Sequence, residues 1–133
     1  MIYLPDTNVF SRFFQGRDPD LARRFIAEYP HLRLSVLVLG ELEFGAAKSG
    51  IARHRARVER LTTDLEVAPW TPEDARHYGR IRAELERTGQ KIGTFDTLIA
   101  AQALRLGATV VTHNLREFRR VPGLRVEDWQ STA

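Results

Sequence analysis

Residues 2–8 read IYLPDTN, and this stretch sets the fold class of the chain. Three apolar residues are followed by Pro5 and Asp6, and a helical pattern begins directly after the aspartate. A short apolar run of this kind is typical of a strand buried in the centre of an α/β sheet. Asp6 then lies just past the carboxyl end of that strand, which is where open α/β sheets build their functional sites.

Apolar runs and helical patterns alternate along the rest of the chain. We expect strands at residues 2–4, 32–36, 65–68, 109–112 and, more weakly, 124–126. We expect helices at residues 7–15, 21–29, 37–49, 51–62, 72–88 and 95–106. This alternation predicts an α/β fold, a three-layer α/β/α sandwich with a mostly parallel sheet of four to five strands. The length of the chain predicts one domain over residues 1–133.

The composition limits the class of protein. Hydrophobic residues make up 43% of the chain and charged residues 28%, values that are typical of a soluble globular protein. No apolar run approaches the ~20 residues of a membrane span, and the first apolar run lacks the preceding basic region of a secretory signal. Cysteine is absent, which excludes disulfides, thiolate metal sites and cysteine nucleophiles. We expect a cytoplasmic protein without a membrane partner.

The basic residues are almost all arginine. The formal net charge is +3, and the only lysines are Lys48 and Lys91. Arginine suits bidentate contact with phosphate, so the bias favours a polyanionic partner. A solvated, arginine-rich surface and an acidic partner protein are the alternatives. The arginines that could contact the phosphates of such a partner are Arg12, Arg53, Arg55, Arg57 and Arg116.

Three acidic residues lie far apart in the sequence, each in an apolar setting. Asp6 ends the first strand, Glu41 lies inside the apolar helix 37–49, and Asp96 stands in the first turn of the helix 95–106. Carboxylates are rarely buried unless they are paired or bound to metal. If the fold brings them together they repel one another, and a divalent cation resolves the repulsion. The pattern therefore predicts a metal-dependent phosphoryl-transfer site.

Each acid also has a structural interpretation. Asp6 and Asp96 could cap or charge a helix N-terminus, and Glu41 could pair with an arginine in the core. Glu41 shares a helical face with Leu37 and Gly45, residues that we expect to pack inward. Glu43 lies about 200° away around the helix, so it is expected at the surface.

The segment after the fourth expected strand carries further polar groups. Asn114 is a candidate for a water-mediated metal contact, and Glu117 is a candidate fourth acid. Four other hydroxyl and amide side chains could orient water at the site, or could simply make hydrogen bonds at helix starts: Thr7, Asn8, Thr97 and Thr112. A set of carboxylates and amides selects Mg²⁺ or Mn²⁺ over Zn²⁺.

Four segments of the chain, taken in order, resemble a known family. Residues 4–8, 35–45, 92–101 and 111–124 together look like a PIN-domain ribonuclease of the VapC toxin type found in VapBC toxin–antitoxin modules. Trp129 also falls where this group often ends. The match runs along essentially the whole chain, which makes the set specific although each segment alone would be weak.

The resemblance implies an α/β/α fold, RNA cleavage that depends on Mg²⁺ or Mn²⁺, and metal-binding roles for Asp6, Glu41 and Asp96. It also implies a cognate VapB-type antitoxin, a homodimer and a larger assembly with the antitoxin. Many PIN domains carry an aspartate where this chain has Asn114, and Glu117 is the expected substitute.

Other classes fit less well. A receiver domain needs a lysine after its last strand, and neither lysine of this chain follows a strand. A haloacid-dehalogenase phosphatase needs two aspartates at its first strand end, where this chain has only Asp6. The remaining alternative is a non-catalytic RNA-binding protein of the same fold, which would not need to take up Mn²⁺.

Overall fold

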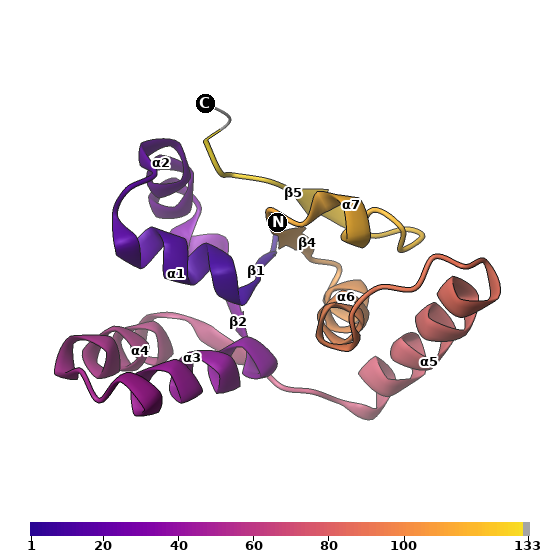
Figure 1. The fold of residues 1–133 in the computed structure, drawn as a ribbon, viewed down its shortest axis with the longest axis horizontal. Coiled ribbons are helices and arrows are strands. Elements are labelled where there is room, and N and C mark those ends of the chain that lie inside the picture. The colour runs from indigo at the N-terminus through magenta and orange to yellow at the C-terminus, as the bar shows by residue number, and fades with distance from the viewer. Residues whose placement is uncertain (132–133) are drawn as a thin grey trace.

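A computed structural model describes residues 1–131, and residues 132 and 133 of the expected domain lie outside the described part. The strands are β1 (Tyr3–Pro5), β2 (Arg33–Ser35), β3 (Glu66–Ala68), β4 (Thr109–Val111) and β5 (Arg125–Glu127). The helices are α1 (Thr7–Gln15), α2 (Pro19–Ala27), α3 (Val36–Ser49), α4 (Ala52–Asp64), α5 (Pro72–Arg87), α6 (Thr94–Leu106) and α7 (Leu115–Phe118), and a 3-10 turn spans Tyr29–His31 (Figure 1).

The five strands all pair in parallel. β1, β4 and β5 form one group, in which Leu4 lies opposite Val110 and Val110 opposite Val126. β2 pairs with β3, and a single bridge between Tyr3 and Leu32 joins the two groups. The strand order is therefore β3-β2-β1-β4-β5, which confirms the expected parallel sheet. The order reverses between β1 and β4, and parallel sheets open a crevice for ligands beyond the strand ends at such a point.

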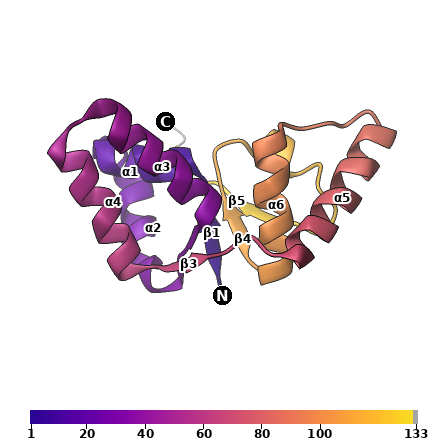
Figure 2. The ribbon, with the colours of Figure 1, turned by 90° about the horizontal axis from the view of Figure 1, so that it is seen from below.

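Helices cover both sides of the sheet. α1 to α4 lie on one side of the strands, whereas α5 and α6 lie on the other (Figure 2). The path from β1 through β2 to β3 runs one way across the sheet, and the path from β3 to β4 returns past β1. Right-handed connections then place the two sets of helices on opposite faces. The three-layer sandwich is confirmed.

The core explains why the strands are apolar throughout. Leu4, Leu34 and Val110 are fully buried because helices cover both faces of their strands. Phe25 of α2 packs edge-on against Phe10 of α1, with ring centroids 5.7 Å apart. These contacts fix α1, and with it the segment that follows Asp6. None of the helices within residues 1–131 is long and apolar enough to cross a membrane.

Most element boundaries differ from the expected ones by one or two residues. The second helix begins at Pro19 and gives way to the 3-10 turn after Ala27, because Pro30 disfavours helical backbone in the residue before it. α6 begins at Thr94, one residue before the expected start, with Gly93 as its N-cap. The short helix α7 was not expected, because four residues carry too little periodicity to be recognised.

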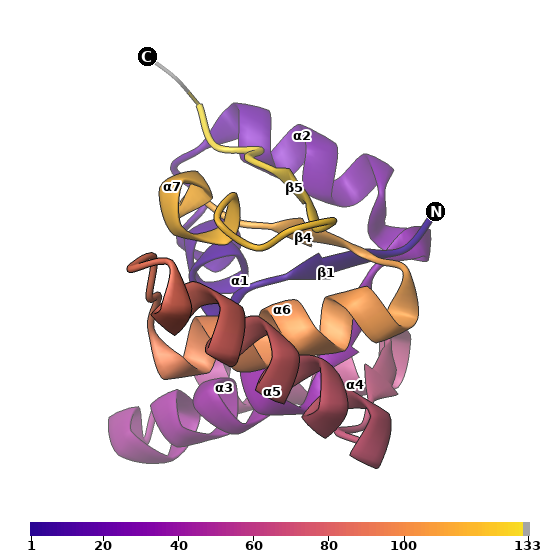
Figure 3. The ribbon, with the colours of Figure 1, turned by 90° about the vertical axis from the view of Figure 1, so that its right-hand side faces the viewer.

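The loop after β5 returns to the first helices. Figures 1 and 3 show the chain running from β5 toward α2. There the buried carboxylate of Asp18 accepts hydrogen bonds from the backbone N–H and the hydroxyl of Ser131. Residues 128–131 therefore run from the end of β5 to α2 and cover one side of the carboxyl ends of β1 and β4. We call these four residues the strap.

Candidate active site

Asp6 is fixed at the carboxyl end of β1 by three groups. Its backbone N–H donates to the carbonyl of Val111 at 3.0 Å, which continues the β1–β4 pairing by one residue. Its Oδ1 accepts from the N–H of Val9 at 3.1 Å, so the expected N-cap role is real. Its Oδ2 accepts from the hydroxyl of Thr112 at 2.7 Å. Capping uses only one oxygen, and the carboxylate still faces the end of β4.

Asn114 connects two further acids. Its side-chain Nδ2 donates to Asp96 Oδ2 at 3.0 Å and to Glu117 Oε2 at 2.6 Å. Its backbone N–H donates to Thr112 Oγ1 at 2.9 Å. The Thr112 hydroxyl also donates to Asp6, so hydrogen bonds run without a break from Asp6 to Asp96 and Glu117. We call these five residues, which come from the ends of β1 and β4 and from α6 and α7, the acidic network.

The carboxylates of the acidic network repel one another, and hydrogen bonds hold them together. Burial raises the pKa of Asp6, and the hydrogen bond from Thr112 opposes that rise. Burial also raises the pKa of Asp96, and the nearby charges of Glu117 and Asp6 push it further in the same direction. A low-dielectric setting and like charges both disfavour ionised carboxylates. A cation at this place would reverse both effects.

The chemistry of the donors fits a hard divalent cation. Carboxylate and amide oxygens are the ligands that Mg²⁺ and Mn²⁺ prefer. The hydroxyl of Thr7, directly after Asp6, is buried and has no hydrogen-bond partner among residues 1–131, so it is available to an added ligand or water. In that part of the chain no three His, Asp or Glu side chains converge on one point as they stand. The NH₂ group of Asn114 lies between Asp96 and Glu117, where a bridging cation would lie.

Comparison with known proteins decides the family. A family model described as "PIN domain" matches residues 3–124. The tRNA(fMet)-specific endonuclease VapC of Salmonella typhimurium is 40% identical over 128 residues, which is 96% of this chain and 97% of that protein. Ribonuclease VapC2 of Haemophilus influenzae is 37% identical over the same share of both chains.

Two solved structures agree with this result. The VapBC2 structure of Rickettsia felis, bound to a promoter DNA fragment, matches at a TM-score of 0.88 and 31% identity, covering 98% of this chain and 100% of that one. DNA-bound VapBC of Salmonella typhimurium matches at a TM-score of 0.87 and 40% identity, covering 97% and 98%. The chain belongs to the VapC family of PIN-domain proteins. The resemblance found in the sequence is confirmed.

Glu41 lies apart from the acidic network of this VapC-family chain. It is exposed on α3, and no hydrogen bond or ion pair engages it within residues 1–131. Of the face that we expected to pack inward, Leu37 lies partly buried against the core, but Glu41 and Gly45 are exposed, because the buried stripe of α3 is Val38, Leu42 and Ala46. Ser35 ends β2 and caps α3, and this start sets the helix one residue out of the expected phase.

The alternative for Glu41 was an ion pair with an arginine, but the glutamate of α3 that forms such a pair is Glu43. Glu43 accepts two hydrogen bonds from Arg55 of α4, at 2.8 and 2.9 Å, in a half-exposed ion pair. Glu41 has no such partner, so nothing in α4 competes for its charge. α3 begins at the carboxyl end of β2, the strand beside β1, so Glu41 lies on a helix that starts at the same end of the sheet as Asp6.

The other polar candidates separate into two groups. Thr97 donates its hydroxyl to the carbonyl of Gly93 at 2.8 Å, which is the simple helix-start hydrogen bond. Thr112 is fully committed to the acidic network. Thr7 stays unpartnered, and Asn8 is exposed at the mouth of a neighbouring pocket.

The five candidate arginines are not equivalent. Arg12 binds the buried Asp18 at 2.8 Å, Arg55 binds Glu43, and Arg57 lies over the ring of Phe14 at 5.2 Å. Arg53 and Arg116 are exposed and take part in none of the ion pairs within residues 1–131. Arg57 also forms no ion pair there, so Arg53, Arg57 and Arg116 keep a charge that no carboxylate of the described residues neutralises.

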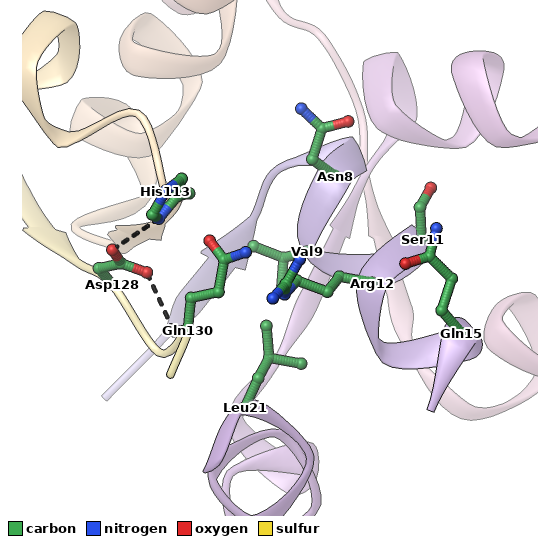
Figure 4. A pocket seen from close by; sticks show the side chains of 9 residues that line it. All are labelled: Asn8, Val9, Ser11, Arg12, Gln15, Leu21, His113, Asp128 and Gln130. Carbon is green, nitrogen blue, oxygen red and sulfur yellow. Dashed lines mark hydrogen bonds and ion pairs between the residues drawn. The ribbon is translucent and has the colours of Figure 1, made fainter. Parts of the chain in front are cut away.

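The strap contributes residues that sequence reasoning missed. Asp128 follows β5, contacts His113 at 2.9 Å, and is close enough for its charge to raise the pKa of Asp6. Gln130, two residues further along the strap, lies between His113 and Arg12 (Figure 4). One signal was present: an acid directly after a strand, as at Asp6. It was overlooked because the fifth strand was weak in the sequence.

Proposed function

We propose that this chain is the toxin of a type II toxin–antitoxin module, an endoribonuclease that hydrolyses RNA phosphodiester bonds with bound Mg²⁺ or Mn²⁺. The observation that carries the proposal is the acidic network at the crossover between β1 and β4. Three carboxylates in one partly buried place need a compensating cation. The names of the VapC relatives, which are an endonuclease and a ribonuclease, support the reaction class.

The chain's own groups position the reaction. Hydrogen bonds hold Asp6 at both oxygens, so its free lone pairs keep a fixed direction toward the network. We propose Asp96 and Glu41 as the other ligands, with Glu117 at a second ion or its waters. A bound cation would neutralise charge on the scissile phosphate and lower the pKa of a water. Water attack leaves a 3′-hydroxyl and a 5′-phosphate.

The polar side chains around the ligands orient water. The free hydroxyl of Thr7 is available for this because it has no protein partner within residues 1–131. Asn114 can take the same role once its NH₂ group no longer bridges Asp96 and Glu117. Arg53 and Arg116 contact flanking RNA phosphates, since their charges are not already paired within the described residues.

The inhibitor of this activity is a VapB-type antitoxin, as the VapBC complexes among the solved structures suggest. α3 and the start of α4 present the apolar side chains Val36, Phe44 and Ile51 to solvent, and Phe44 is 62% exposed. An amphipathic helix of the antitoxin can bury these side chains and reach toward Glu41. Such a module acts in the cytoplasm, where its RNA substrate is found.

Sequencing of RNA 5′ ends after brief induction tests the proposed activity. New 5′-phosphate ends should accumulate with the wild type and not with Asp96→Asn. In purified form, the wild type should lose activity in EDTA and recover it in Mn²⁺. A protein that binds RNA but produces no new ends, and takes up no Mn²⁺, would instead be a non-catalytic RNA-binding protein of this fold.

A further inference from the structure

A pocket of about 280 Å³ lies beside the acidic network. α1, Leu21 of α2, the loop after β4 and the strap line it (Figure 4). Asn8 and Val9 follow Asp6 in the first turn of α1, and His113 directly follows Thr112, so the pocket is built partly on the segments that follow two network residues. A strand of RNA that crosses the network would therefore run past the mouth of this pocket.

Neutral hydrogen-bonding side chains form part of the walls. Ser11 and Gln15 project from α1, and Gln130 projects from the strap toward Arg12 (Figure 4). The buried side chains of Val9 and Leu21 add an apolar surface. Amides and hydroxyls offer donors and acceptors together, which is what the edge of a nucleobase requires.

The ionisable groups of the pocket already have hydrogen-bond partners. The guanidinium of Arg12 donates from Nε to Asp18 Oδ2 at 2.8 Å, and with the amide oxygen of Gln130 turned toward it the separation is 2.6 Å. His113 Nδ1 lies 2.9 Å from Asp128 Oδ2. A phosphate would have to compete with these carboxylates and would be repelled by them. A neutral ligand would not, and the planar guanidinium and imidazole groups can stack on a ring.

We propose that this pocket binds one nucleobase of the RNA strand next to the scissile phosphate, and so sets the sequence preference of cleavage. Its volume lies just below the ~300–1,000 Å³ of pockets for small ligands, which suits a single base and excludes a duplex. Single-stranded bases can turn out of the stack and enter such a pocket. The proposal rests on the proposed ribonuclease function for the path of the strand, but base binding itself does not require cleavage.

The pocket is formed before any ligand arrives. Asp18 caps α2 through the N–H of Leu21 at 3.1 Å and also binds the N–H of Ser131 at 3.1 Å, so it ties the strap to α2. Asp128 accepts from the backbone N–H of Gln130 at 3.0 Å, which fixes the direction of the strap between them. A wall held at both ends loses little entropy on binding, and such rigidity favours discrimination between similar ligands.

Binding can be tested without catalysis by titrating ¹⁵N-labelled protein with each of the four nucleoside 5′-monophosphates in EDTA. The side-chain amide signals of Gln15 and Gln130 should shift with one or two of the four nucleotides. The amides of Gln90 and Gln102 serve as internal controls, since Gln90 lies between α5 and α6 and Gln102 is buried against the carbonyls of Ala68 and Pro69. Equal shifts with all four nucleotides, or no shift, would overturn the proposal.

Cleavage of a randomised RNA pool provides the second arm. Gln130→Ala should lower the base preference at one position beside the cut by about tenfold, the size of one lost base-reading side chain. Gln90→Ala is the matched control and should keep the wild-type preference. The Mn²⁺-dependent rise in Tm should be the same in both variants, because neither residue belongs to the acidic network. An unchanged preference in Gln130→Ala would contradict the proposal.

The two proposals fail in different ways. If the nucleotide shifts are selective but the wild type cuts no RNA in Mn²⁺, the ribonuclease function is wrong and the base pocket stands. If the wild type cuts RNA but the amides respond only to a peptide of the antitoxin and to no nucleotide, the pocket is a protein-binding site and the base proposal is wrong.

Discussion

The hydroxyl of Thr112 donates a 2.7 Å hydrogen bond to the carboxylate of Asp6. Each residue is the first beyond its strand, and β1 and β4 are paired, so the contact follows from the register of the sheet. The same hydroxyl accepts the N–H of Asn114. Thr112 therefore sets the orientation of Asp6 and of the loop that carries Asn114 at once, and a change at this residue should affect both.

Thr112→Val should impair metal-dependent cleavage while the chain stays folded. The substitution keeps the shape and removes the hydrogen bond that opposes the rise in the pKa of Asp6, so that pKa should rise further. The acid limb of the rate profile should then move to higher pH, and the Mn²⁺ requirement should increase about tenfold, as expected for a lost hydrogen bond to a charged group. Rates measured across pH and Mn²⁺ concentration test this. Thr109→Val, a buried threonine within β4, is the control and should change neither quantity.

Asp96→Asn should abolish cleavage without lowering the stability of the metal-free protein. Burial and the charges of Glu117 and Asp6 disfavour the ionised form of Asp96, and the neutral amide removes that repulsion. The Tm in EDTA should be equal to that of the wild type or slightly higher. Asp20→Asn, an exposed acid, serves as a control for removal of a charge. A marked drop in the Tm of Asp96→Asn would assign Asp96 a structural role.

The two glutamates of α3 should respond differently to metal. Glu41→Gln should leave the metal-free Tm unchanged, because the side chain is exposed and unpaired within residues 1–131, but should reduce the rise in Tm caused by Mn²⁺. Glu43→Gln should lower the metal-free stability by about 0–1 kcal/mol through its ion pair with Arg55, and the Mn²⁺ effect should persist. Thermal unfolding with and without Mn²⁺ measures both. Equal Mn²⁺ effects in the two variants would show that Glu41 is not a ligand.

Glu117→Gln should weaken cleavage and raise the Mn²⁺ concentration needed for half-maximal rate. Glu117 contributes a full negative charge to the acidic network, whereas Asn114 contributes an amide. Asn114→Ala should therefore act more mildly, through lost orientation. Metal titrations of the cleavage rate compare the two variants with the wild type. A Glu117→Gln protein with unchanged rate and metal dependence would leave a site of three carboxylates.

The contribution of Asp18 to stability should disappear in acid. Hydrogen bonds from Ser131 and Arg12 hold the pKa of Asp18 below its ordinary value of 3.8. A lowered pKa stabilises the fold above the ordinary value, and that stability is lost as the pH falls through the folded-state pKa. Asp18→Asn should thus unfold at lower urea than the wild type at about pH 7, and the difference should begin to shrink below the ordinary value of 3.8 and continue to shrink as the pH falls further. The difference would stay constant if Asp18 acted through packing alone.

Asp6 and Asp96 have the opposite sign. Their pKa values are raised in the folded protein, so their contribution is fully present below the ordinary value of 3.8 and is lost as the pH rises through the folded-state values. The metal-free protein thus carries a cost at neutral pH that the proposed cation would remove. This cost is confined to the acidic network, whereas Asp18, which caps α2 and binds the end of the strap, shows the reverse pH dependence.

Much of the fold could be predicted from local patterns. The apolar runs marked all five strands, and Asp6 and Asn114 were placed at one edge because both follow strands. The phase of α3 could not be predicted, because Val36 to Leu39 are all apolar and give no stripe, so the face of Glu41 depended on where Ser35 begins the helix. The pairing of Arg12 with Asp18 and the return of the strap are tertiary contacts between distant residues, which no local pattern encodes.

The amide of Asn114 also has a consequence for how the protein is handled. Structural metal sites usually unfold when the metal is stripped, because nothing else holds their ligands together. Here a side chain of the protein bridges Asp96 and Glu117 and keeps them in place without an ion. Chelation should therefore act as a reversible off switch that leaves a folded, storable protein. A toxic enzyme could be purified in that silent state and restarted by adding cation.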